Sequence, residues 1–221
     1  MKKLVKLSII IIFLHILMAS CSKEENTEIN TCTTFELGGK QYATVQIGNQ
    51  CWMAENLNFN AGPGSWQGPD QNERYGMYYT WETAKRVCPD GWHIPTYDDW
   101  EELMQYISDQ NGGYDRETYD EDSFVWHDIA IHLKTNDMWT TDDGTNDYGF
   151  SALPAGYRWI EPSTGDVVWS EYNFSSLWWS SSNDGTYPCH CFLNDRDQDF
   201  THYKTAAHLV NDGFSVRYVK D

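Results

Sequence analysis

The chain has few basic residues and lacks the short motifs that identify common hydrolases and nucleotide-binding enzymes. Its 221 residues include 15 Lys or Arg against 33 Asp or Glu, a formal net charge of −18 at pH 7. A surface of this sign repels phosphate backbones, which argues against nucleic-acid binding. The sequence contains no Gly-X-Ser-X-Gly elbow, no His-Glu-X-X-His pair and no phosphate loop, so no catalytic residue can be assigned.

The sequence also lacks an apolar run long enough to cross a membrane. The run at 7–18 has about a dozen residues, whereas a transmembrane helix needs roughly 20. Lysines precede this run and Ala-Ser-Cys follows it, which indicates a signal peptide over residues 1–20. The ending resembles a bacterial lipobox and implies that Cys21 is acylated, with enough chains for stable anchoring.

Residues 21–31 are polar and are predicted to form a flexible tether behind the lipidated cysteine. Lys23-Glu24-Glu25 is similar to the export signal of Bacteroidetes surface lipoproteins. We therefore expect an outer-membrane lipoprotein that faces the cell surface, with a periplasmic orientation as the open alternative. Loss of residues 1–20 removes three lysines and no acidic residue, which changes the net charge from −18 to −21.

The remaining chain is long enough for one domain with a substantial core, which we place at residues 32–221. Alternating apolar residues over 33–57, with Gly38-Gly39 as a turn, predict a β-hairpin followed by a third short strand or turn. Residues 58–74 are rich in Gly, Pro, Asn and Gln and predict a loop, in which Trp66 is a candidate for an exposed contact.

Two helices are predicted next. The apolar spacing over 76–87 favours the first. Thr96 is a good N-cap for the second, over 97–108, where apolar side chains recur at i, i+3, i+4 and i+7. From about residue 109 the pattern favours short strands and long loops, with a last strand at 214–219.

Five motifs occur in a fixed order along this domain. They are QCWMAENL (50–57), CPDGWHIPT (88–96), GFSALPAGYR (149–158), WWSSSNDG (178–185) and DGFSVRYVKD (212–221). Together they resemble the Fibrobacter succinogenes major paralogous domain of many Bacteroidetes and Fibrobacteres lipoproteins. That resemblance covers residues 32–221 and implies an α+β fold of the C-type lectin-like kind, with two helices, short antiparallel strands and long loops. Trp92, Trp178 and Trp179 are expected in its core, and Arg217 is expected to be structural.

Five cysteines remain beside Cys21, and an exported protein permits disulfides. Cys32 and Cys51 flank the predicted hairpin and are a candidate pair. The family commonly has a cysteine where this chain has Tyr218, which implies that the usual mate of Cys88 is missing. Cys88 is then either a free buried thiol or is paired with Cys189 or Cys191.

Two segments were considered as metal sites. Cys189-His190-Cys191 offers ligands for zinc or copper, but alternation along a strand turns His190 away from both cysteines. Asp142, Asp143, Asn146 and Asp147 lie in a glycine-containing turn whose oxygens suit calcium, although their spacing does not match an EF-hand. A solvated turn is the alternative there, and we predict no other cofactor.

Residues 183–212 lie between two well-matched motifs, yet their own sequence is unpatterned. In related lectin-like proteins diversified by retroelements, the variable binding residues occupy this stretch, so we expect the ligand-binding face here. Ordinary divergence of a surface is the alternative. The candidate residues are Tyr187, His190, Phe192, Asp195, Arg196, Asp197, Phe200, His202 and Tyr203.

The sequence therefore predicts a surface-anchored module for adhesion or ligand binding, with an extracellular glycan or protein as its partner. The abundance of aromatic side chains, with 11 Trp and 14 Tyr, suits stacking on sugars. One alternative is an oxidase related to the formylglycine-generating enzymes, which would need a reactive cysteine pair and copper. Another is a non-catalytic structural component of the envelope.

Overall fold

The computed structural model describes residues 32–121, 123–140, 144–205 and 207–221. The predicted signal peptide, Cys21 and the tether fall outside these residues. The described residues belong to one compact unit. Within the described part of the chain, no helix has both the length and the apolar character that a membrane crossing requires.

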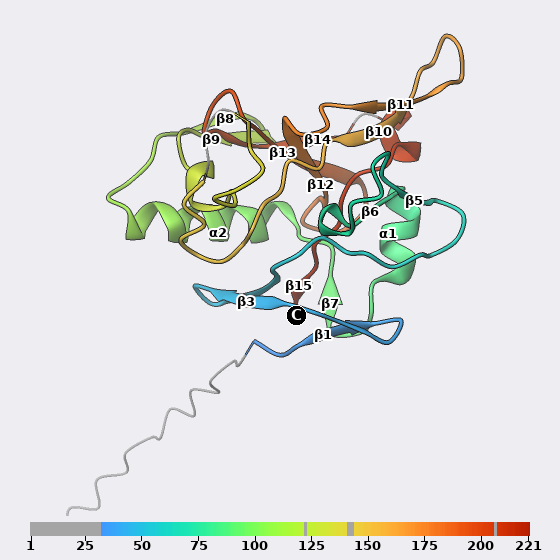
Figure 1. Ribbon diagram of the computed structural model, residues 1–221. Coiled ribbons are helices and arrows are strands. Elements are labelled where there is room, and N and C mark those ends of the chain that lie inside the picture. Colours follow the sequence, from blue (N-terminus) through green and yellow to red (C-terminus); the bar gives the residue numbers. More distant parts are fainter. Residues whose placement is uncertain (1–31, 122, 141–143, 206) are drawn as a thin grey trace, which may run out of the picture. The chain divides into compact units, whose positions relative to one another are not determined.

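The largest element is a five-stranded antiparallel sheet in the order β12-β13-β14-β9-β8, drawn across the upper part of Figure 1. Each of the four neighbouring pairs is antiparallel, and the pairing of β8 with β9 contains a register shift. Its strands are β12 (Ser175–Ser181), β13 (Pro188–Asn194), β14 (Phe200–Lys204), β9 (Ser123–Trp126) and β8 (Arg116–Asp120).

A four-stranded sheet in the order β3-β4-β15-β7 joins the C-terminal end of the chain to its early strands. In this sheet Val219 pairs with Trp52 on one side and with His93 on the other. The strands are β3 (Thr44–Ile47), β4 (Gln50–Met53), β15 (Val219–Lys220) and β7 (Trp92–His93). The last strand is therefore much shorter than the predicted 214–219, although Phe214 and Ser215 make isolated bridges.

Three two-stranded hairpins complete the β structure. The first turns at Gly38-Gly39, both with positive φ, as the sequence predicts. The hairpins are β1 (Phe35–Leu37) with β2 (Lys40–Tyr42), β5 (Ser65–Gln67) with β6 (Met77–Tyr79), and β10 (Tyr157–Ile160) with β11 (Val167–Ser170). Short 3₁₀ helices lie at η1 (Glu73–Tyr75), η2 (Ala130–His132) and η3 (Ala207–Asn211).

The described residues contain two α-helices, α1 (Trp81–Val87) and α2 (Tyr97–Gln110). The prediction for α2 is confirmed, and a capping box between Thr96 and Asp99 explains where this helix begins. The prediction of a helix from residue 76 is wrong in its first turn. There Met77–Tyr79 pair with β5, and the helix begins only after Thr80, whose side chain accepts from the Thr83 N–H.

The predicted fold class is also wrong. The described residues are mostly β, arranged in several small antiparallel sheets, and no C-type lectin-like fold is identified. The reason is that the five motifs hold contacts in the core and so do not determine how the sheets are arranged. Closely spaced Gly, Pro and Asn turns divide the chain into hairpins that pair locally, which raises the strand content above the α+β expectation.

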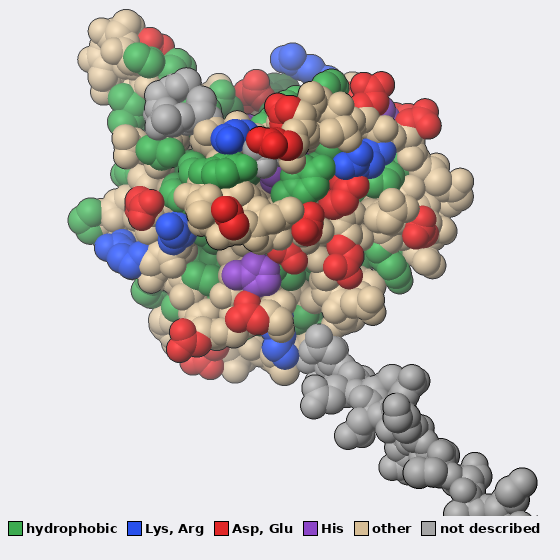
Figure 2. Space-filling view, turned by 180° about the vertical axis from the view of Figure 1, so that it is seen from behind, with side chains coloured by type: hydrophobic (Ala, Val, Ile, Leu, Met, Phe, Trp, Pro, Cys, Tyr) green, Lys and Arg blue, Asp and Glu red, His purple; other side chains and the backbone are tan. Residues whose placement is uncertain are grey.

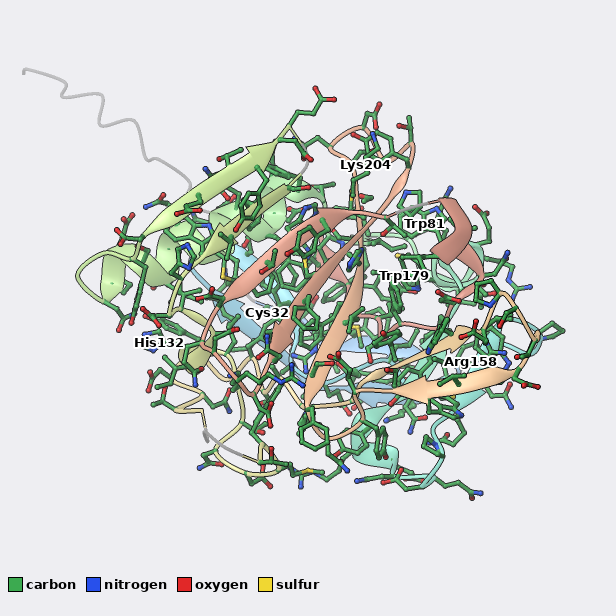
Figure 3. All side chains as sticks on the ribbon, turned by 90° about the horizontal axis from the view of Figure 1, so that it is seen from above. Cys32, Trp81, His132, Arg158, Trp179 and Lys204 are labelled. Atoms are coloured by element: carbon green, nitrogen blue, oxygen red, sulfur yellow. A yellow bond between two sulfur atoms is a disulfide. The ribbon has the colours of Figure 1, made fainter. Side chains whose placement is uncertain are left out.

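The two faces of the five-stranded sheet differ. One face packs against α2 and places Trp178, Cys191 and Phe200 in a core cluster with Trp52 and Trp100. The other face places Leu177 and Trp179 in a second cluster with Trp81 and Phe214. The rings of Trp81 and Trp179 lie 5.7 Å apart, side by side in Figure 3. Trp178 and Trp179 are thus core residues as predicted, while Trp92 is half-buried against Phe35.

Four of the five motifs meet around Asn56. Its Oδ1 accepts from Trp178 Nε1 at 2.9 Å and from Arg217 Nε at 2.9 Å. Arg217 also donates to the backbone carbonyls of Phe150 and Ser151. The remaining motif contributes Pro95, whose carbonyl accepts from Ser180 Oγ at 2.9 Å and from the Ser181 N–H. These contacts hold Asn56, Trp178 and Arg217 in the core, which confirms the structural role predicted for Arg217.

Candidate functional site

Strand β13 divides the candidate binding residues between two faces of the sheet. Its burial alternates along Pro188–Asn194, with Cys189, Cys191 and Leu193 fully buried and the residues between them half-buried. Because neighbouring side chains on a strand point to opposite faces, His190 and Phe192 share the outer face. Across the sheet, His190 pairs with Tyr203 on β14, which brings this tyrosine to the same face.

This outer face forms one wall of an open groove of about 410 Å³, here called the aromatic groove. Strand β10, β12, η3 and the residues that follow β11 and η3 contribute the rest of the lining. The groove is lined by Tyr157, Trp159, Glu171, Leu177, His190, Phe192, Tyr203, Leu209, Asp212 and Phe214. Six of these ten residues carry aromatic rings, so the groove offers flat apolar walls with two carboxylates.

Two smaller depressions continue the aromatic groove. One of about 110 Å³ shares Glu171 and Phe192 with it and reaches Phe174 and Arg196. Another of about 350 Å³ shares Trp159, Leu209 and Asp212 with it and reaches Pro162. Because the lining residues are shared, the three form one extended surface suited to a ligand longer than a single ring.

Three polar side chains of the groove, those of His190, Asp212 and Trp159, are described by their hydrogen bonds and, for His190, by its protonation state. His190 Nδ1 lies 2.9 Å from Thr205 Oγ1. Burial, with a smaller contribution from His202, lowers the pKa of His190 to about 4, so the imidazole is neutral at neutral pH. Asp212 Oδ1 accepts from the Ile160 N–H at 3.2 Å. The indole N–H of Trp159 is buried and has no partner among the described residues.

Glu171 marks the junction between the aromatic groove and the smaller depression beside Phe174. Its φ of 51° lies in the left-handed region, which non-glycine residues seldom adopt. The turn that it begins is closed by the N–H groups of Phe174 and Ser175, which donate to its carbonyl at 2.9 and 3.0 Å. The strained backbone places an exposed carboxylate at the rim of the groove.

Of the nine residues predicted from the sequence, three line the aromatic groove: His190, Phe192 and Tyr203. Phe200 and His202 are fully buried on the opposite face, where His202 Nε2 lies 2.8 Å from Ser180 Oγ. These two side chains pack in the core because the alternation along the strand turns them inward.

The other four predicted residues do not line the aromatic groove. Asp195 is buried and accepts from Thr140 Oγ1, and Arg196 and Asp197 are exposed in the turn between β13 and β14. Tyr187 is half-buried under the ammonium of Lys204, which lies 3.9 Å from its ring centroid. Asp195 and Arg196 line the small depression beside the groove.

Sequence reasoning missed the residues that the β10–β11 hairpin contributes. Tyr157 and Trp159 alternate with Arg158 in the motif segment, which is the pattern of a strand with one aromatic face. This signal was present in the sequence. The alternation alone does not show which elements pack against either face of the strand.

The calcium candidates are only partly described, since Asp142 and Asp143 lie outside the described residues. Asp147 Oδ2 accepts from Thr145 Oγ1 at 2.5 Å and lies 2.6 Å from His132 Nδ1. Asn146 Oδ1 accepts from the Ser151 N–H at 2.7 Å. These oxygens are engaged in holding the turn. No group of three or more potential metal ligands occurs among the residues that the structure describes.

The cysteines of the described residues form one disulfide and leave three thiols. The predicted disulfide between Cys32 and Cys51 is present. Cys88, Cys189 and Cys191 are thiols, and both strand cysteines are fully buried. Burial raises the pKa of Cys88 to about 12 and raises that of Cys191 well above its ordinary value. Buried thiols with raised pKa values are poor nucleophiles, which speaks against a reactive cysteine pair.

Figure 2 shows acidic side chains spread over one face of the molecule, with few basic ones among them, as the composition predicts. The model of the family described as Fibrobacter succinogenes major domain matches residues 45–220 of the chain. Nothing matches the chain among curated proteins or among solved structures.

Proposed function

The chain belongs to the Fibrobacter succinogenes major domain family, and we propose that its own function lies in the aromatic groove. The protein binds an extracellular carbohydrate there and performs no chemistry on it. The observation that carries this proposal is the groove itself, with aromatic walls, two carboxylates and an unpartnered indole N–H. Sugar rings stack on aromatic faces, and their hydroxyls pair with carboxylates and imidazoles.

Attachment at the cell surface is the second part of the proposal. Residues 1–20 act as a signal peptide and Cys21 is the lipidated first residue of an outer-membrane protein, with residues 22–31 as its tether. Mass spectrometry of the protein from cells checks this, with acyl chains expected on Cys21. Surface protease treatment of intact cells should remove the domain. An unprocessed N-terminus or full protection from protease would contradict the respective part.

The ligand proposal is tested with purified residues 31–221, which form one compact unit. The protein is applied to a glycan array with and without calcium, and the best ligand is titrated by calorimetry. Tyr203→Ala and Trp159→Ala each remove one aromatic wall and are expected to weaken binding about tenfold or more, because a stacked aromatic contributes about 1–3 kcal/mol.

Tyr119→Ala is the matched control. Tyr119 is 59% exposed on the same sheet but does not line the groove, so this variant should bind as the wild type does. Equal losses in all three variants would mean that recognition needs any exposed aromatic residue and not the groove. Binding of a protein ligand alone, or of no array member, would overturn the carbohydrate proposal and favour a structural role in the envelope.

A further inference from the structure

A second groove lies on the other face of the β10–β11 hairpin. In this antiparallel pair Arg158 is opposite Trp169, and Tyr157 is opposite Ser170. Because successive residues point to opposite faces, Tyr157 and Trp159 enter the aromatic groove while Arg158 and Trp169 enter the second one. One hairpin thus separates two binding surfaces, and Figure 3 places Arg158 on this hairpin.

The second groove, here called the arginine groove, has a volume of about 670 Å³. Arg158 and Trp169 form one side, and the opposite side comes from the segment that leads into β5 and from β5 itself. Trp66, Asn58, Asn60 and Gln67 contribute that side. The described lining contains no Asp or Glu, in a chain whose net charge is −18.

Arg158 is a buried cation without a close counter-charge. Arg158 is only 6% exposed, and its guanidinium lies 3.8 Å from the ring centroid of Trp66. No carboxylate among the described residues lies within ion-pair distance of it, although Asp212 acts on it from further away. Its Nη1 is buried and has no hydrogen-bond partner in the described structure.

Burying a guanidinium without a hydrogen-bond acceptor costs free energy. An anion that supplies the missing acceptor removes this cost. Stacking on Trp66 fixes the plane of the guanidinium, which leaves its N–H edge oriented for a planar two-oxygen acceptor. Beside it, Gln67 Nε2 is also buried without a partner. Two residues that line the groove, Arg158 and Gln67, therefore each carry an unsatisfied buried donor.

The remaining walls suit a sugar ring. Trp66 and Trp169 are half-buried, and both line the groove. Asn58 and Asn60 add amide groups at the rim, where Asn60 is exposed. Indole surface next to side-chain amides fits the alternating apolar and hydroxyl faces of a pyranose.

We propose that the arginine groove binds an acidic sugar that carries a single negative charge, with its carboxylate or sulfate on Arg158 and its ring against Trp66 and Trp169. One guanidinium neutralises one charge. The acidic surface around the groove disfavours polyanions, because the net charge of the chain repels them. The site shares no lining residue with the aromatic groove, so it does not rest on the function proposed above.

Calorimetric titration of residues 31–221 tests this site. The probes are oligosaccharides that contain a single glucuronate or galacturonate residue among neutral sugars, the same oligosaccharides with one sulfate in place of that carboxylate, and their neutral counterparts. We expect the carboxylated or the sulfated series to bind at least tenfold more tightly than the neutral series, and the tighter of the two identifies the anion.

Asn60→Asp is the main variant, because Asn60 Oδ1 accepts from the Gly62 N–H at 2.9 Å and an aspartate preserves this bond. The new charge in the groove should weaken acidic sugars at least fivefold without affecting folding. Arg158→Lys keeps the charge but loses the two-point geometry, and it should also weaken them. Thermal unfolding reports whether either variant is folded. Tyr203→Ala, in the other groove, should leave acidic sugars unaffected.

Equal affinity for acidic and neutral sugars would overturn the proposal. So would unchanged binding of acidic sugars in folded Asn60→Asp. A lack of binding by every acidic probe would overturn it as well. If acidic sugars bind as expected while Tyr203→Ala has no effect on any ligand, the arginine groove stands and the carbohydrate site in the aromatic groove fails.

Discussion

Arg217 and Asn56 are 161 positions apart in the sequence, yet Arg217 Nε donates to Asn56 Oδ1 at 2.9 Å in the core. Arg217 is fully buried, and burial lowers its pKa to about 9, so it remains charged at neutral pH. The charge is satisfied by neutral oxygens, those of Asn56 and of the carbonyls of Phe150 and Ser151. This contact therefore joins the start, the middle and the end of the domain.

The first prediction concerns this pair. Arg217→Met leaves several buried acceptors without donors, so it should lower the free energy of unfolding by about 3 kcal/mol or more, measured by urea denaturation of residues 31–221. Arg196→Met, at an exposed turn, should change it by less than about 0.5 kcal/mol. In a double-mutant cycle, Asn56→Ala should couple to Arg217→Met by about 1 kcal/mol or more. Additive losses would show that the two side chains act independently.

A second prediction follows from His190. Its pKa is about 4 in the folded protein and near 6.5 when unfolded, because burial disfavours the charged ring. Between these pH values only the unfolded state takes up the proton, so this residue makes stability fall as pH falls from about 6.5 to about 4. Its contribution should be on the order of 1–3 kcal/mol at the acid end of this window.

The measurement is chemical denaturation at several pH values between 7 and 4, for the wild type and for His190→Gln. The difference between the two isolates His190 from other groups. One such group is His93, whose pKa is lowered by burial but raised on balance by hydrogen bonds with Asp99 and Asp221. His93 therefore adds stability at acid pH, the opposite sign. Parallel pH profiles for wild type and His190→Gln would contradict the prediction.

The third prediction concerns thiol reactivity. Cys189 and Cys191 are fully buried, and the pKa of Cys88 is raised to about 12, chiefly by burial. Native protein at pH 7–8 should react with Ellman's reagent only very slowly, because the thiolate is the reactive form. Denatured, unreduced residues 31–221, which do not include Cys21, should release three equivalents. One or two thiols that react rapidly in the native state would instead support a reactive cysteine pair and the oxidase alternative.

A fourth prediction concerns the disulfide. Cys32 and Cys51 close a loop with a sequence separation of 19, which restricts the unfolded chain. Replacing both cysteines by serine should lower the free energy of unfolding by about 2–4 kcal/mol. Cys88→Ser, which removes a thiol outside any disulfide, is the control and should cost less. Equal losses in the two variants would mean that the effect comes from lost packing and not from the cross-link.

Some features could be predicted because they depend on neighbouring residues. The Thr96 cap and the apolar spacing after it define α2, and Gly38-Gly39 defines the first hairpin. Where the local preference of a segment disagrees with its tertiary pairing, the pairing determines the secondary structure. Met77–Tyr79 fit a helical pattern, but pairing with β5 holds them as a strand.

The candidate site was predicted only in part for a related reason. Position in the 187–203 segment identified His190, Phe192 and Tyr203, but it equally suggested Phe200 and His202, which face the core. Which face is covered depends on α2 packing beneath one side of the sheet, and no residue of the segment itself carries that information.

The sequence by itself determined the family, the acidic surface, the second helix, the first hairpin and the disulfide, because composition, short motifs and local spacing are enough for each. Only the tertiary structure decided the mostly β architecture and the position of the two grooves. The physical reason is that a groove forms between elements distant in sequence. Its lining depends on strand register and on which faces are covered, as at Tyr157, Arg158 and Trp159, three successive residues that serve two different surfaces.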